Sequence, residues 1–94
     1  MYLKNKNLLA ELLDDGSAIL YDQHTEKTFI LNSIGYYVFE NIEGSSVETL
    51  SNEIYYNVRN QNEYDVDEIY TYIENYIKML LDSGLVVQRI WWHP

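Results

Sequence analysis

The side chains that most often carry enzymatic chemistry are few in this chain and are not grouped. The two histidines are His24, in a polar turn, and His93, in the C-terminal tail, and the 94 residues include no cysteine. A histidine without a second ligand at metal-binding spacing is more often a surface residue than a catalyst. The sequence therefore predicts no catalytic residue, no bound metal ion, no cofactor and no enzymatic activity.

The clustered acidic residues are better explained by local structure than by acid–base catalysis. Asp14–Asp15 precede Gly16 in a turn, and Asp65–Glu68 lie where a helix is expected to begin. Carboxylates at a helix N-terminus interact favourably with the helix dipole. The acidic residues of each cluster are spaced too closely to form an EF-hand loop. The glycines are isolated, so no phosphate-binding loop is indicated.

Charge and composition restrict the class of partner. The net charge is −9, from 15 acidic and 6 basic residues, which disfavours phosphate backbones and anionic membranes. No segment approaches the roughly 20 apolar residues of a membrane span, and the N-terminus lacks the features of a signal peptide. We expect one cytoplasmic domain over residues 1–94. Its ten tyrosines and two tryptophans favour a surface that is half-buried or that binds a partner.

Three short apolar runs separated by turn residues open the chain. They are roughly Leu8–Leu13, Ser17–Tyr21 and Thr28–Leu31, divided by "DDGS" and "DQHTE". Asp-Gly between apolar runs is a strong hairpin signal, so these runs are interpreted as three antiparallel strands. The leucines of the first run also fit a helical period, and the turn chemistry favours the strand.

After Leu31 the apolar period lengthens to about 3.6 residues, which indicates helices. The first is predicted from an N-cap at Ser33 to about Ile42, before Gly44, with Ile34, Val38 and Ile42 buried. The second begins at Ser45 or Ser46, where Ser45 and Glu48 fit a capping box, and buries Val47, Leu50, Ile54 and Val58. The third runs from a cap at Asp65 to about Ser83, and "LVVQRIWW" then forms an extended end.

The third helix carries two apolar stripes. The core stripe comprises Val66, Ile69, Tyr70, Ile73, Ile77, Leu80 and Leu81. Tyr72, Tyr76 and Met79 lie along one edge of that stripe and form what we call the α3 shoulder. This shoulder is either the solvent-exposed edge of a wide core stripe or the wall of a binding groove.

The strand Thr28–Leu31 lacks the features that normally protect an edge. Edge strands are blunted by charge, proline or a covering element, because their unpaired N–H and C=O groups recruit other strands. "TFIL" has none of these, and Lys27 lies only at its start. If the strand is an edge, it suits strand addition by a peptide. Leu31 and Phe29 should face the core, with Thr28 and Ile30 on the other face.

Several short motifs occur along the chain in a fixed order. They are Asp15–Gly16 before an apolar strand, Leu31–Asn32, an aromatic-rich helix ending at Gly44, Val47–Glu48, and Leu80 with Gly84–Leu85–Val86. As a set they resemble the PqqD-like family, the leader-peptide recognition elements of ribosomally made, post-translationally modified peptides. The resemblance spans about residues 8–87 and leaves a tail, 88–94, whose "WWHP" departs from the family's usual end.

The resemblance implies an α+β fold, with a three-stranded antiparallel sheet followed by three helices in a winged helix–turn–helix arrangement. It implies non-catalytic binding of a precursor's leader, which adds as a strand to the third strand beside the third helix. The partner would be a leader peptidase, as in lasso-peptide pathways, or another maturation enzyme such as a radical SAM enzyme. The residues placed at this site are Lys27, Thr28, Phe29, Ile30, Leu31, Ile69, Tyr72, Ile73, Tyr76 and Met79.

Two other classes of function remain open on the sequence alone. The implied topology also suits a winged helix–turn–helix DNA-binding regulator, although that requires a basic surface. The second and third helices together contain only Lys78 if the second ends by Val58. A structural subunit whose aromatic residues mediate oligomers is the third class.

Overall fold

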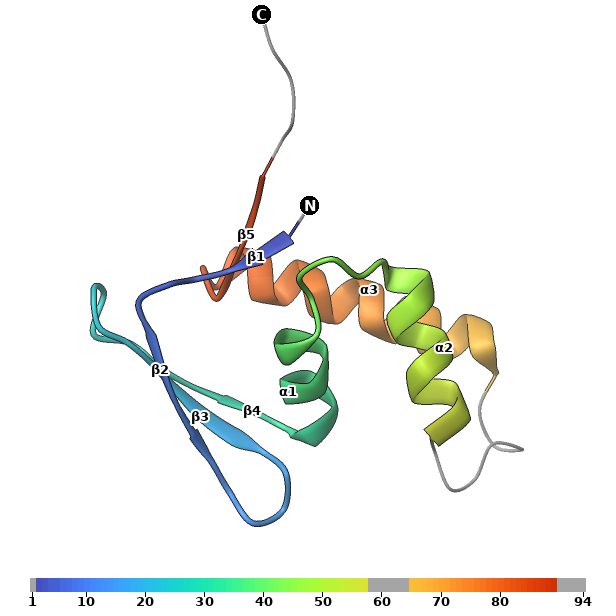
Figure 1. Cartoon of the computed structure of the whole chain (residues 1–94), viewed down its shortest axis with the longest axis horizontal. Coiled ribbons are helices and arrows are strands. Elements are labelled where there is room, and N and C mark those ends of the chain that lie inside the picture. The colour runs from blue at the N-terminus through green and yellow to red at the C-terminus, as the bar shows by residue number, and fades with distance from the viewer. Residues whose placement is uncertain (1, 58–64, 90–94) are drawn as a thin grey trace, which may run out of the picture.

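The computed structural model describes residues 2–57 and 65–89 of the chain (Figure 1). In chain order the elements are β1 (Tyr2–Lys4), β2 (Leu8–Leu12), β3 (Ala18–Asp22), β4 (Thr28–Leu31), α1 (Ser33–Glu40), α2 (Val47–Asn57), α3 (Val66–Asp82) and β5 (Val86–Gln88). The three-stranded sheet lies on one side of the molecule and the helices on the other, with α1 packed against both β4 and α3. The predicted α+β fold of three antiparallel strands and three helices is confirmed.

The sheet has the order β2-β3-β4, with both pairs antiparallel. The first apolar run is therefore a strand and not a helix. Leu12 pairs with Ala18 across the Asp-Gly turn, and Ala18 pairs on its other side with Leu31. Because β3 occupies the centre, β4 is an edge strand within the described part of the chain.

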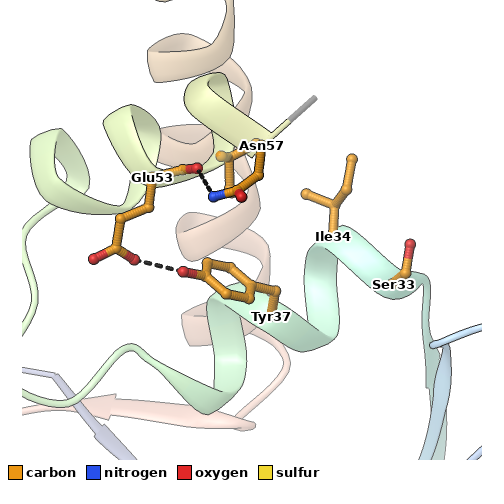
Figure 2. Close-up of a pocket in the computed structure, with 6 residues that line it drawn as sticks. Ser33, Ile34, Tyr37, Glu53 and Asn57 are labelled. Carbon is orange, nitrogen blue, oxygen red and sulfur yellow. Dashed lines mark hydrogen bonds between the residues drawn. The ribbon is translucent and has the colours of Figure 1, made fainter. Parts of the chain in front are cut away.

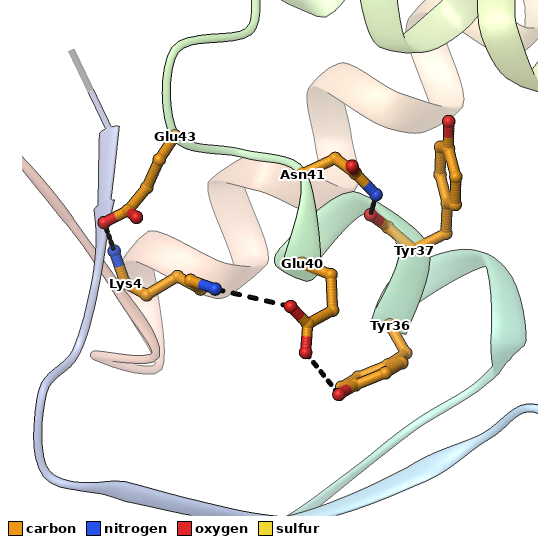
Figure 3. Close-up of polar contacts among 6 residues, drawn as sticks. All are labelled: Lys4, Tyr36, Tyr37, Glu40, Asn41 and Glu43. Atoms are coloured by element: carbon orange, nitrogen blue, oxygen red, sulfur yellow. Dashed lines mark hydrogen bonds and ion pairs between the residues drawn. The ribbon is translucent and has the colours of Figure 1, made fainter.

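The strand β1 was not among the elements expected from the sequence. This strand pairs antiparallel with β5, which matches Tyr2 with Gln88 and gives the expected extended end a partner. Polar contacts tie β1 to the end of α1 and the loop after it (Figure 3). Lys4 donates its backbone N–H to Glu43 Oε2 at 3.1 Å, and its Nζ lies 3.3 Å from Glu40 Oε2. The Tyr36 hydroxyl donates to the same Glu40 carboxylate.

One helix start differs from the expected one, and another is narrowed from two expected residues to one. The N-cap of α1 is Asn32 and not Ser33, because the Asn32 Oδ1 accepts the backbone N–H of Gly35 at 2.7 Å. For α2, the Ser46 hydroxyl accepts the N–H of Thr49 at 3.1 Å, so the cap is Ser46, one of the two predicted start residues, and not Ser45, for which a capping box with Glu48 was expected. α3 is capped by Asp65 as predicted.

The core joins the sheet to all three helices. Its fully buried side chains include Leu20 and Leu31 from the sheet, Val38 from α1, Leu50 from α2, and Ile73 and Leu80 from α3.

On α1 the buried stripe is Gly35, Val38 and Phe39, and the chain continues to buried Ile42 after the helix ends. Ile34, which was predicted to be buried, is 38% exposed because Gly35 takes its place on the core-facing side. Val66 and Tyr70 of α3 are also exposed, so the core stripe of α3 is narrower than predicted. The predicted core position Val58 lies outside the described residues.

Asp22, at the end of β3, organises the turn that leads into β4. Its Oδ1 accepts the backbone N–H groups of Thr25 at 3.1 Å and of His24 at 2.8 Å. Its Oδ2 accepts Asn5 Nδ2 at 3.0 Å, and the same Asn5 Nδ2 also donates to the carbonyl of Gly84. The hydrogen bond from the Thr25 N–H, followed by those from His24 and Asn5, lowers the pKa of the Asp22 carboxyl below its ordinary value.

We expect Asp22→Asn to reduce the acid sensitivity of folding. A carboxyl whose pKa is lower in the folded state stabilises the fold above its unfolded-state pKa, and this contribution is lost as the pH falls through the folded-state pKa. The variant should melt at a lower temperature at neutral pH, and the difference from wild type should shrink on acidification. Thermal melts followed by circular dichroism across the carboxyl titration range test this. A difference in melting temperature that is independent of pH would contradict the electrostatic role.

Candidate functional site

The register of the sheet determines which backbone groups of β4 remain available. The N–H of Asp22 donates to the carbonyl of Lys27 at 2.9 Å, so this pair is of the hydrogen-bonded kind. Hydrogen-bonded and non-hydrogen-bonded pairs alternate along an antiparallel ladder. The pairs Leu20–Phe29 and Ala18–Leu31 are therefore hydrogen-bonded, whereas Tyr21–Thr28 and Ile19–Ile30 are not. The N–H and C=O groups of Thr28 and Ile30 point away from β3, towards the open edge.

The bonds on the other side of β3 agree with this assignment. Gln23 N–H donates to the carbonyl of Asn7 at 3.0 Å, and Leu13 N–H donates to that of Ser17 at 2.8 Å. Odd-numbered residues of β3 thus bond to β2, which leaves the even-numbered ones for β4. The backbone groups of Phe29 and Leu31 are consequently engaged with β3.

The side chains of β4 alternate as the sequence predicts. Leu31 is buried and Phe29 is half-buried against the core cluster, whereas Thr28 is exposed and Ile30 is 74% exposed. A strand added at this edge would bond to Thr28 and Ile30. Half of its side chains would lie on the core-facing side of the sheet and half beside Ile30.

The α3 shoulder is present as predicted. Tyr72 is 44% exposed and Met79 is 38% exposed, whereas Tyr76 is half-buried. The rings of Tyr72 and Tyr76 are tilted against each other, with centroids 5.9 Å apart. Burial, and then the neighbouring Tyr72, raise the pKa of Tyr76, so its hydroxyl stays protonated.

Tyr76 connects the α3 shoulder to the start of α1, just after β4. A Cβ built on Gly35 would lie 1.9 Å from the Tyr76 hydroxyl oxygen and 2.2 Å from the adjacent ring carbon. Only glycine admits the ring at this position. Tyr76 is therefore partly a packing residue, and Tyr72 and Met79 are the freer members of the shoulder.

We expect Gly35→Ala to destabilise the protein by about 1–3 kcal/mol, because the added methyl group overpacks the contact with Tyr76. Helix propensity alone predicts that Gly35→Ala stabilises the protein, since alanine is the better helix former by up to about 1 kcal/mol. Combining it with Tyr76→Ala should remove the clash, so the two losses of stability should be less than additive. Urea denaturation of the four members of this double-mutant cycle measures the coupling. A Gly35→Ala variant more stable than wild type would rule out the close approach.

The remaining predicted site residues lie behind this surface. Ile69 and Ile73 are buried, at 7% and 0% exposure, and belong to the core that supports the shoulder. Lys27 is exposed at the start of β4, and its carbonyl is occupied by Asp22. The helix α1 contacts both β4, with its outward backbone groups, and α3, which carries the apolar shoulder. An open strand edge of this kind can accept an extended peptide.

The described residues contain no group of three or more His, Cys, Asp or Glu side chains placed to hold a metal ion. Within the same ranges, no helix has the length and apolar character needed to cross a bilayer.

A family model matches most of this fold. The model described as "Coenzyme PQQ synthesis protein D (PqqD)" matches residues 17–86, from just before β3 to the first residue of β5. The chain belongs to the PqqD family. The resemblance noted in the sequence is thereby confirmed, and no curated protein sequence matches the chain.

Two solved structures share the fold of this PqqD family member. "TbiB1 in Complex with the TbiA(beta) Leader Peptide" is 16% identical with a TM-score of 0.76, covering 94% of this chain and 98% of that chain. "Lasso peptide synthetase B1 complexed with the leader peptide" is 12% identical with a TM-score of 0.77, covering 93% and 98% respectively.

A pocket between α1 and α2 was not predicted (Figure 2). It is lined by Ser33, Ile34, Tyr37, Glu53, Ile54 and Asn57. The sequence did contain a signal for it: Gly35, Val38, Phe39 and Ile42 repeat at the spacing of a helical stripe. If Gly35 is counted as a core position, the helical stripe places Ile34 on the side of α1 that faces α2.

Proposed function

We propose that this chain is a non-catalytic recognition protein for the leader of a ribosomally made precursor peptide, of the lasso-peptide class. The leader adds as a strand to β4, and the bound complex delivers it to a leader peptidase or another maturation enzyme. The observation that carries the proposal is the open edge at Thr28 and Ile30, in a fold shared with two proteins solved with leader peptides.

The chemistry of the surface supports binding without catalysis. Outward backbone N–H and C=O groups provide affinity through ladder hydrogen bonds, and apolar side chains provide pockets for alternate residues. The exposed side chains there are those of Thr28, Ile30, Tyr72 and Met79. The complex would work in the cytoplasm, where the precursor is translated.

The charge distribution does not support the DNA-binding alternative. The two helices that would face a duplex, α2 and α3, carry six acidic residues and Lys78 as their basic residue. Phosphate backbones require clustered basic side chains.

The test uses a candidate precursor peptide, sought among the short open reading frames that neighbour this gene. Isothermal titration should show binding of its leader, and a scrambled leader of the same composition should not bind. Mass spectrometry should recover the bound precursor unaltered, and amide exchange should slow at Thr28 and Ile30. Cleavage or modification of the precursor by this chain alone would overturn the non-catalytic role. Protection that spares residues 27–32 would overturn the binding mode.

A further inference from the structure

The pocket between α1 and α2 has the size of a site for one side chain. Its volume is about 200 Å³, below the roughly 300–1,000 Å³ typical of small-molecule sites. Apolar walls come from Ile34 on α1, Ile54 on α2 and the ring of Tyr37, and Figure 2 shows Ile34 and Tyr37 on one wall with Asn57 opposite. Ile34 and Tyr37 are each 38% exposed, so the pocket opens to solvent.

The polar atoms of the pocket are mainly hydrogen-bond acceptors. The Tyr37 hydroxyl donates to Glu53 Oε2 at 2.5 Å, and Asn57 Nδ2 donates to the carbonyl of Glu53 at 2.6 Å. The Tyr37 hydroxyl and one hydrogen of Asn57 Nδ2 are thus directed at Glu53, while the second Nδ2 hydrogen and the Ser33 hydroxyl are further donors at the pocket. The hydrogen bond to Glu53 raises the pKa of Tyr37, which keeps the hydroxyl in its donor form.

Carboxylate and amide oxygens give the pocket acceptor capacity for an incoming group. A carboxylate offers about four acceptor positions, and the Oδ1 of an asparagine accepts when its Nδ2 donates. Glu53 is also the one charged side chain that lines the described pocket. An acidic side chain would be repelled there, whereas a long side chain with a basic head would find an apolar channel and a negative end.

The position of the pocket relates it to β4. Ser33 and Ile34 follow the last residue of β4, Leu31, by two and three positions. An extended peptide advances about 3.3 Å per residue, so a strand paired with β4 reaches α1 within a few residues of leaving the edge.

We propose that this pocket receives a lysine or arginine side chain of the leader, beyond the segment that pairs with β4. This inference rests on the proposed function and adds a specificity determinant to it. The aliphatic stem packs on Ile34 and Ile54, and the cationic head is held by Glu53 and Asn57.

The test uses a displayed library of random linear peptides, selected against the full chain. Binders are kept only if they lose affinity for Ile30→Pro, which restricts the set to peptides that use β4. We expect these binders to carry a basic residue at a fixed offset from their paired segment. Resynthesising the best binder with norleucine at that position should weaken binding by about five- to tenfold.

Matched variants assign the effect to the pocket. Glu53→Gln retains an acceptor for the Tyr37 hydroxyl, so the fold should persist, and it should reduce the effect of norleucine to less than about twofold. Glu48→Gln removes the same charge from an exposed position of α2 and should leave the effect unchanged. Ile34→Ala tests the stem contact at a side chain that the fold does not bury.

The possible failures are distinguishable. Binders that depend on β4 but show no basic preference, or that prefer an apolar residue at the offset, overturn the pocket and leave the proposed function standing. An equal response to norleucine in wild type and Glu53→Gln does the same. A library that yields no binder sensitive to Ile30→Pro overturns the proposed function and this inference with it.

Discussion

Replacing Ile30 by proline is expected to weaken leader binding by about tenfold or more while the domain stays folded. The N–H of Ile30 points to the open edge, so proline removes a bond that the leader needs and none that β3 needs. Loss of one ladder bond, together with the bulk of the ring at the edge, should weaken binding on the order of tenfold or more. Fluorescence anisotropy with a labelled leader measures the loss, and circular dichroism verifies the fold.

Phe29→Pro is the matched control. The same substitution one residue earlier removes an N–H that pairs with Leu20, and it deletes a half-buried ring. It should unfold the sheet. If instead Ile30→Pro unfolds the protein and Phe29→Pro does not, the register-based assignment of the edge is wrong. Wild-type affinity in a folded Ile30→Pro variant would exclude pairing through this residue.

The sequence predicted β4 well because its signals are local. The alternation of Thr28, Phe29, Ile30 and Leu31 defines the two faces, and Asn32–Ser33 end the strand. Which backbone groups face outwards was not predictable. That direction depends on the turn from Asp22 to Lys27, where Glu26 adopts a left-handed conformation with φ of 62°, and no side-chain pattern encodes it.

The β1–β5 pair was missed for a different reason. Each strand has three residues, and their partners lie at opposite ends of the sequence. Three residues give too short an alternation to recognise, and pairing between the chain ends is invisible to a local window. Asn5, which bonds to both Asp22 and Gly84, helps to hold this corner together through tertiary contacts.

Glycine explains the errors at α1 and the pocket. A stripe assigned by hydrophobicity counts Ile34 and omits Gly35, yet the absent side chain of Gly35 is what lets Tyr76 pack against the helix. Leaving Gly35 out of the buried stripe also explains why the pocket was not predicted. With Ile34 assigned to the core, no apolar side chain of α1 was expected to face α2. Close approach between helices is a property of the pair, and a single-helix pattern does not contain it.

The second large effect is expected on α3, where leader binding and stability should separate. Ile73 is fully buried, so Ile73→Ala should destabilise the fold by about 2–5 kcal/mol through the cavity that it leaves. Tyr72 is 44% exposed, so Tyr72→Ala should change stability by about 0.5 kcal/mol or less. If Tyr72 contacts the leader at the centre of the interface, its loss should weaken binding by about 2 kcal/mol, or roughly thirtyfold.

Tyr76 should fall between these extremes, since its ring both packs on Gly35 and borders the surface. Met79→Ala should follow Tyr72, because Met79 is 38% exposed. Urea denaturation measures the stability of the four alanine variants, and titration with leader measures their affinity. Stability losses at Tyr72 and Met79 as large as that at Ile73 would make the α3 shoulder merely the edge of the core. Wild-type affinity in both would show that neither Tyr72 nor Met79 contributes to recognition of the leader.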